Sequence, residues 1–437
     1  MKVLLVGSGG REDALAWALS RSPRLRTLRC APGNAGIARR AECVAIGAGE
    51  VDRLADHARD EGYDLVVIGP EAPLVEGLAD RLREGGVTVF GPSAGAARIE
   101  GSKVFAKEFM ARQRIPTAAF RVFDELPTAR AYLESDEARY PLVVKADGLA
   151  AGKGVIMADD AATALTAVEG MLSGRLFGEA GSRVVIEERL FGREASFFVL
   201  ADGERFVELP TCQDYKRAAD RDFGPNTGGM GTYSPSAYLL EEARSMIVES
   251  IVRPTIAGLG AEGHPYRGVL YVGLMLTTEG PKVLEYNARF GDPETQVLVP
   301  RLDGDWLALL QACASGELER QQPRWKSEPA VCVVMASGGY PGSYDKGHPI
   351  EGIESAEKLD GVEVFHAGTG ADASGGFVTA GGRVLGVTAT GDDLQAARRR
   401  AYEAVGRIGW KDEYHRSDIA EDAVREPVGQ PGAEENR

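Results

Sequence analysis

The sequence predicts a multi-domain α/β protein that begins with a doubly wound parallel sheet and ends with a small α+β domain. Its 437 residues are too many for one hydrophobic core, so we expect about two to four domains. In the first hundred residues, short apolar runs each end in a Gly- or Pro-rich loop that leads into a helical pattern. From about residue 325, short strands alternate with glycine-rich turns instead.

Four apolar runs define the predicted N-terminal sheet. The first spans residues 3–6 and is followed by the turn Gly7-Ser8-Gly9-Gly10 and a helix that reaches about Ser20. The others lie around Leu28 and over residues 65–68 and 87–90, and they end in loops 31–36, 69–74 and 91–93. Because parallel strands bring their carboxyl ends to one edge of the sheet, we expect these loops to form a binding rim.

The first turn lacks a dinucleotide-binding fingerprint. The G-x-G-x-x-G pattern requires a third glycine at position 12, where this chain has Glu12. Ala31 and Pro32 stand where an acidic residue would bind the ribose of NAD. NAD is therefore disfavoured, whereas a phosphate group on the N–H groups of this turn would suit the positive end of the helix.

The middle of the chain carries a candidate phosphate-binding loop. A helix with Ser102 as its N-cap precedes a strand over residues 141–145, and the glycine-rich segment 146–155 follows that strand. Backbone N–H and lysine ammonium groups in such a loop can cover phosphates, although no P-loop pattern is present. The alternative interpretation is a flexible hairpin loop.

Residues 211–236 show no regular periodicity and are predicted to be a long loop. A loop of this length inside a compact domain is usually functional or disordered. Its glycine-rich, mixed-charge composition favours contact with substrate. We expect a strand over 184–188 before this loop, and a helix from 241 to about 258 and a strand over 268–276 after it.

A strand over residues 283–289 presents the strongest candidate for metal and phosphate chemistry. Its alternation places Glu285, Asn287 and Arg289 on one face. Carboxylate and amide oxygens suit magnesium, and a guanidinium suits phosphate oxygens. The Gly-Asp-Pro-Glu turn that begins at position 291 adds two further acids. The alternative is an exposed polar face of a strand without a ligand.

The C-terminal part is predicted to be a small α+β unit. Strands are expected over residues 331–335, 362–365, 376–378 and 384–388, with a closing helix over 392–408. Beyond residue 419 the chain becomes acidic and polar, and we expect it to fray.

Composition narrows the function class. The net charge of −15 argues against nucleic acid and anionic membranes as partners. The five cysteines are far apart and form no C-x-x-C pair, which argues against a disulfide framework or a zinc site. The sequence has no membrane-length apolar run and no signal-peptide core, so we expect a cytoplasmic protein.

Several runs of residues resemble those of the glycinamide ribonucleotide synthetase family, also called phosphoribosylamine–glycine ligases, within the ATP-grasp superfamily. The resemblance extends from residue 2 to about residue 419. The most specific runs are Gly224-Pro225-Asn226-Thr227-Gly228-Gly229-Met230-Gly231 and Phe290-Gly291-Asp292-Pro293-Glu294-Thr295-Gln296. The others span 9–12, 31–36, 69–74, 100–103, 145–155 and 338–342.

The resemblance implies a reaction and a domain order. The reaction would join glycine to 5-phosphoribosylamine with cleavage of ATP, giving glycinamide ribonucleotide, ADP and phosphate in purine biosynthesis. The domains would be an N-terminal domain over 1–102, an ATP-grasp domain over 103–325 with a mobile lid over about 119–189, a C-terminal domain over 326–419 and a flexible tail over 420–437. The protein would act as a monomer.

The resemblance also assigns site residues, position by position. As ATP-binding residues it implies Lys103, Lys145, Gly152, Lys153, Gly154, Glu187, Glu188, Leu190 and Glu194. As substrate-binding residues it implies Gly9, Gly10, Pro70, Glu71, Asp214, Lys216, Asn226, Gly228, Gly229, Arg289 and Asp292. Arg289 and Lys145 would be catalytic, and Glu285 and Asn287 would hold Mg²⁺ or Mn²⁺.

The chemistry of such a reaction fits these residue types. A carboxylate does not accept an amine at neutral pH, so glycine must first become an acyl phosphate. That transfer requires positioning and charge neutralisation rather than a protein nucleophile. Two other functions fit the same residues: an ATP-grasp ligase for a different carboxylate and amine, and a nucleotide sensor without turnover.

One residue departs from the pattern of the family. Asp13 stands where the family usually has histidine. In one interpretation its carboxylate turns to solvent or pairs with an arginine such as Arg11. In the other it faces the site and weakens the binding of phosphoribosylamine.

Overall fold

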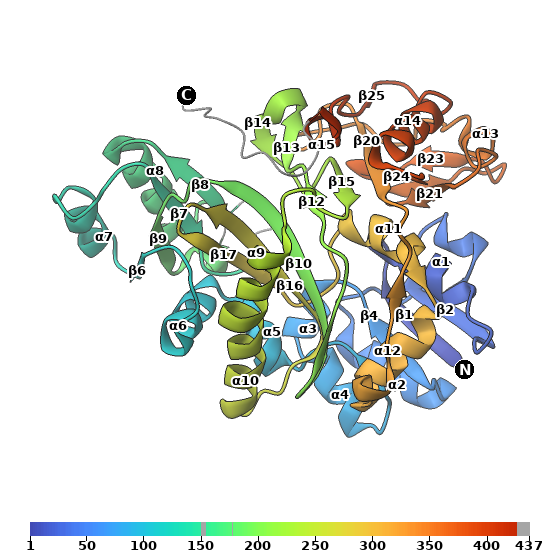
Figure 1. Cartoon of the computed structure of the whole chain (residues 1–437), viewed down its shortest axis with the longest axis horizontal. Coiled ribbons are helices and arrows are strands. Elements are labelled where there is room, and N and C mark those ends of the chain that lie inside the picture. The colour runs from blue at the N-terminus through green and yellow to red at the C-terminus, as the bar shows by residue number, and fades with distance from the viewer. Residues whose placement is uncertain (150–153, 177, 426–437) are drawn as a thin grey trace.

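The computed structural model describes residues 1–149, 154–176 and 178–425 of the chain. It confirms the predicted multi-domain α/β architecture, with an N-terminal parallel sheet, a central antiparallel sheet and a C-terminal sheet (Figure 1). In Figure 1 the C-terminal elements lie above the N-terminal sheet, while a separate four-stranded unit lies to the left. The described residues include no helix that is long and apolar enough to cross a membrane.

The N-terminal sheet has the strand order β3-β2-β1-β4-β5, and all of its pairings are parallel. The strands are β1 Lys2–Gly7, β2 Thr27–Pro32, β3 Glu42–Cys43, β4 Leu65–Ile68 and β5 Val89–Phe90. The helices are α1 Gly10–Ser20, α2 Val51–Glu61, α3 Glu71–Val75, α4 Leu78–Glu84 and α5 Ala94–Gly101. Strand β5 begins two residues later than predicted: the N–H of Val87 still donates to the carbonyl of Leu82 in α4, and Thr88 contributes only its carbonyl to Val66 of β4.

Strand β1 explains why this sheet is covered on both faces. Val3 and Leu5 belong to one hydrophobic cluster, and Leu4 and Val6 belong to another. All four are fully buried, so the strand reads as a continuous apolar run. The loops at the carboxyl ends of β1 and β4 are thereby held at one edge of the sheet.

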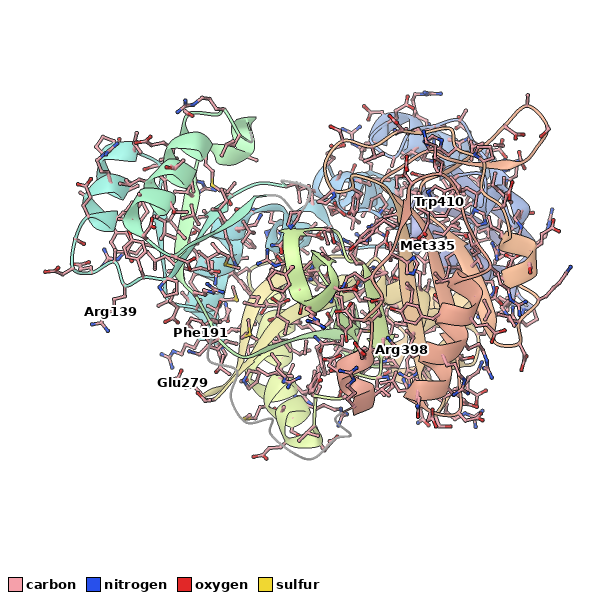
Figure 2. The ribbon with its side chains drawn as sticks, turned by 90° about the horizontal axis from the view of Figure 1, so that it is seen from above. Arg139, Phe191, Glu279, Met335, Arg398 and Trp410 are labelled. Carbon is pink, nitrogen blue, oxygen red and sulfur yellow. The ribbon has the colours of Figure 1, made fainter. Side chains whose placement is uncertain are left out.

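The four-stranded unit over residues 119–189, here called the β6–β9 unit, is an antiparallel sheet with the order β6-β9-β7-β8. It comprises β6 Phe120–Phe123, α7 Leu126–Leu133, β7 Leu142–Ala146, β8 Val155–Ala158, α8 Ala161–Leu172 and β9 Val184–Glu188. It has a hydrophobic core of its own. Figure 2 shows it projecting to one side, with Arg139 at its outer edge and Met335 and Trp410 on the opposite side of the molecule.

The two segments that connect the β6–β9 unit to the rest of the chain lie side by side. The backbone N–H of Glu188 donates to the carbonyl of Ala119 at 3.0 Å, and the N–H of Ala119 donates to Glu188 Oε1 at 3.0 Å. This arrangement is suitable for a hinge, because both connections to the rest of the chain lie side by side.

The central sheet has the order β11-β10-β16-β17. Its strands are β10 Arg193–Asp202, β11 Phe206–Glu208, β16 Arg267–Thr277 and β17 Gly280–Asn287. The associated helices are α6 Lys103–Gln113, α9 Glu241–Ile247, α10 Arg253–Ala261, α11 Glu294–Leu298 and α12 Trp306–Ser315, and a π-helical turn over Val248–Val252 joins α9 to α10. Strand β17 ends at Asn287, so the predicted strand to residue 289 is wrong at its end. Arg289 lies two residues beyond the strand, where its side chain pairs with Glu71 and Glu100.

The segment over 211–236 is not the irregular loop that we expected. It contains four short strands, β12 Gln213–Asp214, β13 Arg217–Ala219, β14 Phe223–Asn226 and β15 Gly231–Ser234. Strand β15 pairs with β20 of the C-terminal sheet over four residue pairs. The periodicity of so short a strand is invisible locally, because its partner lies about a hundred residues further along the chain.

The C-terminal sheet has the order β12-β15-β20-β24-β21, with β25 also paired to β20. Its own strands are β20 Ala330–Ser337, β21 Val362–His366, β24 Arg383–Thr390 and β25 Glu413–Tyr414, beside the hairpin β22 Thr369–Ala371 and β23 Phe377–Thr379. The helices are α13 Ile353–Ala356, α14 Leu394–Val405 and α15 Glu421–Arg425, and β18 Leu302–Asp303 pairs with β19 Arg324–Trp325 before this domain. The predicted strands and closing helix are confirmed within a few residues.

Fraying beyond residue 419 is wrong for residues 420–425. Ala420 is fully buried, and its N–H donates to the hydroxyl of Tyr215 at 3.0 Å. Asp422 accepts hydrogen bonds from the hydroxyls of Tyr215 and Tyr238. These tertiary contacts order α15 although its own sequence is polar.

Candidate active site

Glu285 is the centre of the candidate site. It lies on β17 opposite Gly273 of β16, where a Cβ atom would come within 3.2 Å of Glu285 Cγ. The glycine therefore leaves room for this side chain. Burial would raise the pKa of Glu285, but Lys216, Lys145, Lys103 and Arg289 hold that pKa below its usual value. The site thus contains an ionised carboxylate among four cationic side chains.

Lys145 and a further lysine, Lys107, are both paired with one buried acid. The Glu187 carboxylate on β9 forms ion pairs with Lys145 of β7 and with Lys107 of α6, and all three side chains are almost fully buried. Lys145 Nζ also donates to the carbonyl of Leu284 at 3.2 Å. Burial lowers the pKa of Lys107 to about 8, although the Glu187 carboxylate opposes this. Glu187 thereby links the β6–β9 unit to helix α6.

Lys103 is placed by the N-terminus of α6. Ser102 caps this helix, and its hydroxyl donates to Asp147 Oδ1 at 2.7 Å. Lys103 Nζ donates to the carbonyl of Gly148 at 3.2 Å. Burial lowers the pKa of Lys103, and the charge of Glu285 opposes that shift. The start of α6 is therefore fastened to the loop after β7.

Arg289 is held by oxygens from three elements. Its Nη2 lies 2.9 Å from Asn287 Oδ1 and 3.1 Å from Glu100 Oε1, and its Nε lies 3.3 Å from Glu71 Oε2. Burial raises the pKa of Glu100 to about 7, with Arg289 opposing and Glu71 adding to the shift. The guanidinium is thus fixed in position at the junction between the N-terminal domain and β17.

A second polar cluster adjoins the first through Lys216. Lys216 Nζ lies 3.2 Å from Asp214 Oδ2, whereas the buried Oδ1 of Asp214 has no hydrogen-bond partner in the described part of the chain. Burial raises the pKa of Asp214 to about 7; Lys216 opposes this shift and Glu294 adds to it. Glu294 accepts a hydrogen bond from Tyr271 at 2.7 Å. An orphaned carboxylate oxygen of this kind can accept a donor from a ligand.

Asp292, Gly228 and Gly229 meet at an arginine from the C-terminal sheet. Arg383 Nη1 donates to the carbonyls of Gly228 and Asp292, at 2.6 and 2.7 Å, and its Nη2 lies 3.3 Å from Asp292 Oδ2. Burial would raise the pKa of Asp292, but the charges of Arg383 and Arg11 hold it below its usual value. Gly229 has a φ of +110°, and a Cβ there would come within 2.8 Å of Asp214 Oδ1.

The N-terminal loops form the third part of the site. A Cβ at Gly9 would lie 3.4 Å from Asp292 Oδ2, and one at Gly10 would lie 2.7 Å from Gln296 Nε2. The N–H of Gly9 donates to Glu12 Oε2 at 2.6 Å. The turn is thus already occupied by a carboxylate, which disfavours a phosphate on that N–H. Pro70 is the N-cap of α3, and Glu71 is its first residue.

The remaining predicted residues lie outside these clusters or outside the described chain. Gly152 and Lys153 are not among the described residues. Gly154 is buried, and its carbonyl accepts the N–H of Ala146 at 2.9 Å. Glu188 is the last residue of β9, Leu190 lies in the connection that follows, and Glu194 is on β10. Glu188 and Glu194 are exposed. Asn226 lies in the β13–β14 hairpin opposite Arg217.

Sequence reasoning assigned no role to three residues that organise the clusters, Lys107, Glu100 and Arg383. Lys107 follows Lys103 by one helical turn, and this i, i+4 spacing could have indicated it. Glu100 and Arg383 gave no comparable signal, because their partners are distant in the sequence, whereas Glu294 is one of the two acids expected in the turn that begins at position 291.

Asp13 pairs with an arginine, as one of the two interpretations expected, although not with Arg11 and not at the surface. It is fully buried rather than exposed, and it pairs with Arg40 at 3.1 Å, whereas Arg11 pairs with Glu12. Its Oδ2 accepts the backbone N–H of His366 at 2.7 Å. Burial raises its pKa to about 6 despite the Arg40 charge. Asp13 therefore joins the N-terminal domain to the C-terminal domain.

Three family models match consecutive parts of the chain. They are described as the N domain, the ATP-grasp (A) domain and the C domain of phosphoribosylglycinamide synthetase, and they match residues 1–100, 101–295 and 330–422. The chain belongs to the phosphoribosylglycinamide synthetase family. This confirms the family that the sequence motifs indicated.

Relatives in this family match nearly the whole chain. A phosphoribosylamine–glycine ligase of Brucella melitensis is 51% identical over 97% of this chain and 98% of the relative. One of Pseudomonas aeruginosa is 50% identical over 98% of this chain and 100% of the relative. A crystal structure of the Thermotoga maritima phosphoribosylamine–glycine ligase is 35% identical, with a TM-score of 0.84, over 96% of this chain and 100% of that chain.

A more distant structure shares the fold of the phosphoribosylglycinamide synthetase family. The biotin carboxylase domain of Hydrogenobacter thermophilus 2-oxoglutarate carboxylase has a TM-score of 0.73 at 17% identity, over 95% of this chain and 91% of that chain. At this identity the likeness concerns the fold alone.

Proposed function

We propose that this chain is an ATP-dependent ligase that joins glycine to 5-phosphoribosylamine, giving glycinamide ribonucleotide, ADP and phosphate in purine biosynthesis. Membership of the phosphoribosylglycinamide synthetase family supports this activity, as do the names of relatives at 50–51% identity over nearly the full length. Within the structure, the observation that carries the proposal is the ionised Glu285 among Lys103, Lys145, Lys216 and Arg289.

The donor set around Glu285 fits a divalent cation that is shared with a nucleotide. Across the described ranges, no group of three or more His, Cys, Asp or Glu side chains could enclose a metal ion. Magnesium, however, is commonly bound by one or two protein oxygens together with substrate phosphates. Glu285 and Asn287 would supply these oxygens for Mg²⁺ or Mn²⁺. The ion would neutralise phosphate charge as it develops during transfer.

Lys103 and Lys145 would hold the phosphates of ATP, and Arg289 would hold the oxygens of the transferred phosphoryl group. Glu187 orients Lys145 through their ion pair. The segment Glu187 to Leu190 would contact adenine, and Glu194 would bind the ribose. Gly152, Lys153 and Gly154 belong to the loop that we assign to the phosphates.

The β6–β9 unit would act as the lid over ATP. Its two connections meet at Ala119 and Glu188, so a change at this one point moves the whole unit. Closure matters because an acyl phosphate hydrolyses when water reaches it. We accordingly divide the chain at residues 102, 325 and 419, and the family models, which change at residues 100/101 and span 330–422, support similar boundaries.

The reaction would proceed in two steps, phosphoryl transfer to glycine and then formation of the amide. A carboxylate oxygen of glycine attacks the γ-phosphorus of ATP, the bond from that phosphorus to the β,γ-bridging oxygen breaks, and ADP leaves. The amine nitrogen of phosphoribosylamine then attacks the carbonyl carbon of glycyl phosphate. The carbon–oxygen bond to phosphate breaks, phosphate leaves, and the nitrogen loses one proton. Lys145 and Arg289 stabilise the negative charge that shifts between oxygens in both steps.

Asp214 would bind the ammonium group of glycine. Its Oδ1 is buried and lacks a partner, while Lys216 engages the other oxygen. Lys216 lies near Glu285 as well, so a glycine anchored at Asp214 would direct its carboxylate towards the phosphate site. Gly229 and Pro293 lie beside this Asp214 oxygen, because a Cβ at Gly229 would come within 2.8 Å of Asp214 Oδ1 and 2.5 Å of Pro293 Cδ.

Phosphoribosylamine would lie on the N-terminal rim. Gly9, Gly10, Pro70 and Glu71 form this rim beside Asp292 and Arg289. Carboxylates such as Glu71 and Asp292 are acceptors for ribose hydroxyls. Asn226 and Gly228 would close the rim from the β13–β14 side. We propose a monomer as the active species. The separated cysteines are all free, and we assign the protein to the reducing cytoplasm.

Release of ADP tests the proposal. The enzyme is incubated with Mg²⁺ and ATP, and glycine and phosphoribosylamine are each omitted in turn. We expect ADP only when both are present and little ADP when alanine or serine replaces glycine. ADP formation with another amino acid would favour a different ATP-grasp ligase. Binding of ATP without ADP in any mixture would favour a nucleotide sensor.

A further inference from the structure

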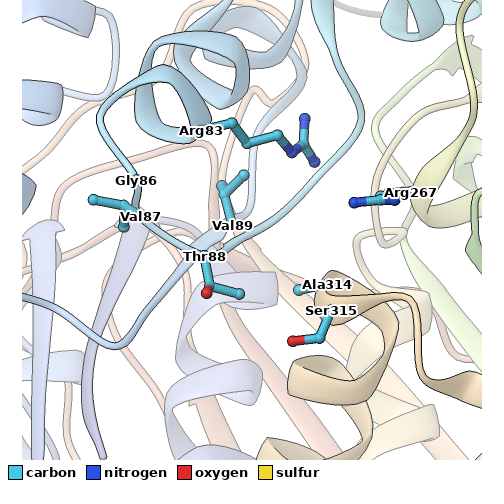
Figure 3. Close-up of a pocket in the computed structure, with 8 residues that line it drawn as sticks. All are labelled: Arg83, Gly86, Val87, Thr88, Val89, Arg267, Ala314 and Ser315. Carbon is cyan, nitrogen blue, oxygen red and sulfur yellow. The ribbon is translucent and has the colours of Figure 1, made fainter.

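A second candidate site lies away from the proposed active site, between the N-terminal domain and the central sheet. A hollow of about 240 Å³ is lined by Arg83, Val87, Thr88, Val89, Arg267 and Ser315, together with Gly86 and Ala314. Figure 3 shows the guanidinium groups of Arg83 and Arg267 facing the same space, with Thr88 and Ser315 below them. None of these residues belongs to the groups around Glu285, Asp214 and Asp292 that form the candidate active site.

The two arginines come from different domains. Arg83 lies in the last turn of α4, and Arg267 is the first residue of β16. Strand β5 is the edge strand of the parallel sheet, and helix α12 packs against both β5 and β16. The hollow is therefore a junction at which the N-terminal domain, the central sheet and the end of α12 meet.

Neither arginine forms an ion pair with a carboxylate within the described ranges of the chain. Arg83 Nη2 donates to the carbonyl of Gly91 at 2.6 Å, and Arg267 Nε donates to the carbonyl of Asp202 at 3.1 Å. Most other arginines of this acidic protein do pair with Asp or Glu. The remaining N–H groups of two guanidiniums are thus available to a ligand.

The nearby acids are committed to backbone groups. Asp80 Oδ2 accepts the N–H of Ala94 at 2.7 Å, and Asp202 Oδ2 accepts the N–H of Leu318 at 3.1 Å. Burial lowers the pKa of Arg83, the charge of Asp80 opposes this, and the charge of Arg267 adds to it. Two like charges that face one hollow repel each other, and an anion between them would remove that repulsion.

The C-terminal end of α12 also borders the hollow. Carbonyl groups at a helix C-terminus carry negative partial charge. Here, however, the N–H of Glu317 donates to the carbonyl of Ala312 at 2.8 Å, and the N–H of Gly316 donates to that of Cys313 at 3.4 Å. Those carbonyls are paired within the helix cap, and Ser315 adds a hydroxyl donor to the hollow.

We propose that Arg83 and Arg267 bind a phosphate group in this hollow, either as inorganic phosphate or as a small phosphate ester. Guanidinium groups match phosphate oxygens in geometry as well as charge. Pockets for drug-sized ligands measure roughly 300–1,000 Å³, so this smaller hollow suits a compact anion.

The bound anion would couple the two domains that shape the active site. Arg267 lies four residues before Tyr271 on β16, and Tyr271 pairs with Asn287 of β17. That separation corresponds to roughly 13 Å along the strand. An anion that ties Arg83 to Arg267 would fix the N-terminal rim relative to the strand pair that carries Glu285 and Asn287.

Isothermal titration calorimetry with inorganic phosphate tests the proposal. Mg²⁺, ADP and glycine are kept at saturating concentrations, and sodium chloride holds the ionic strength constant. We expect Arg83→Gln and Arg267→Gln each to weaken phosphate binding roughly tenfold or more. Arg81→Gln is the matched control, because Arg81 is on the same helix but pairs with Asp52. A second titration uses ribose 5-phosphate in place of inorganic phosphate. Whichever of the two binds more tightly shows whether the free ion or a phosphate ester is the preferred ligand.

An Arg289→Met variant separates this site from the active site. Arg289→Met should retain the heat of phosphate binding that Arg83→Gln loses, because Arg289 lies near Glu285 and not in this hollow. Thermal melting of each variant without phosphate verifies that it is folded, and Thr88→Val provides a milder substitution in the same hollow. Equal phosphate affinity in the wild type, Arg83→Gln and Arg267→Gln would overturn the proposal. If the ADP-release assay showed no ligase activity, the phosphate titration would still test this site, because it measures binding and not turnover.

Discussion

The carboxylate of Asp13 accepts the backbone N–H of His366 at 2.7 Å, across the contact between helix α1 and strand β21. Both residues are fully buried. The other Asp13 oxygen pairs with Arg40 at 3.1 Å. Asp13 thus links the N-terminal domain to the C-terminal domain.

Asp13→Ala should destabilise the protein. The change leaves the N–H of His366 and the largely buried guanidinium of Arg40 without their acceptor, at a cost of about 2–3 kcal/mol. Differential scanning calorimetry should show a lower thermal midpoint. Glu357→Ala is the control, because it removes a more exposed partner of Arg39 and should cost less than about 1 kcal/mol.

The pH dependence of this effect has a defined sign. Because the pKa of Asp13 is raised to about 6, the folded state binds more protons than the unfolded state between about pH 4 and 6. Wild-type stability should therefore fall relative to Asp13→Asn as the pH rises through this range. The KM for phosphoribosylamine should not change in Asp13→Asn or Asp13→His. A lower KM in both variants, most marked at low salt, would instead show that Asp13 faces the substrate.

Glu285→Ala should abolish turnover and preserve the fold. The variant loses an ionised oxygen that we assign to the metal, and transfer then lacks several kcal/mol of charge stabilisation. We expect kcat/KM to fall by about 10³-fold or more. ADP release is measured at increasing Mg²⁺, and circular dichroism verifies the fold. Glu279→Ala, in the turn before β17, is the control because Glu279 is exposed and pairs only with Lys282. Near-normal activity at saturating Mg²⁺ would contradict the assignment.

Lys107→Met should weaken the binding of ATP. Without Lys107, the Glu187 carboxylate has Lys145 as its one remaining ion-pair partner, so Lys145 is less available to phosphate. We expect the KM for ATP to rise roughly tenfold, which corresponds to about 1.4 kcal/mol. In the wild type this KM should also rise above pH 8, where Lys107 loses its proton. Lys358→Met, at an exposed lysine, should behave as the wild type. A wild-type KM that is flat between pH 7 and 9 would show that Lys107 only fills space.

Asp214→Asn should raise the KM for glycine. If the ionised carboxylate holds the ammonium group, binding weakens as Asp214 is protonated, and its pKa is about 7. Lowering the pH from 8 to 6 should therefore raise the wild-type KM roughly tenfold. The variant should show a high KM that no longer depends on pH over this range. Asp372→Asn, in an exposed turn, serves as the control. An unchanged KM for glycine in Asp214→Asn would exclude this role.

Local pattern was sufficient for much of the fold. Strands β1, β4 and β9 lie within one residue of the predicted ranges, because their apolar runs are bounded by Gly, Pro or charged residues. Helix α6 begins where its N-cap serine indicated. The prediction for residues 211–236 was wrong, because β15 is completed by β20 rather than by a neighbour in sequence.

For the candidate site, the sequence identified the residue types but not their arrangement. Alternation along β17 placed Glu285 and Asn287 on one face, and the family motifs indicated Lys103, Lys145 and Arg289. Lys107, Glu100 and Arg383 were missed, and Asp13 was given the wrong partner. In each of these cases the deciding contact joins residues from different elements, up to 353 positions apart for Asp13 and His366.

By itself, the sequence determined the family, the order of the α/β elements and the oxygen, lysine and arginine groups available for phosphate chemistry. Periodicity and turn residues act over a few positions, so they can be recognised in a single chain. The tertiary structure alone decided that Glu187 lies between two lysines, that Arg83 and Arg267 face one hollow, and that Asp13 contacts His366. Charge, burial and hydrogen bonding act through space, and only the packed chain brings their distant partners within a few ångströms.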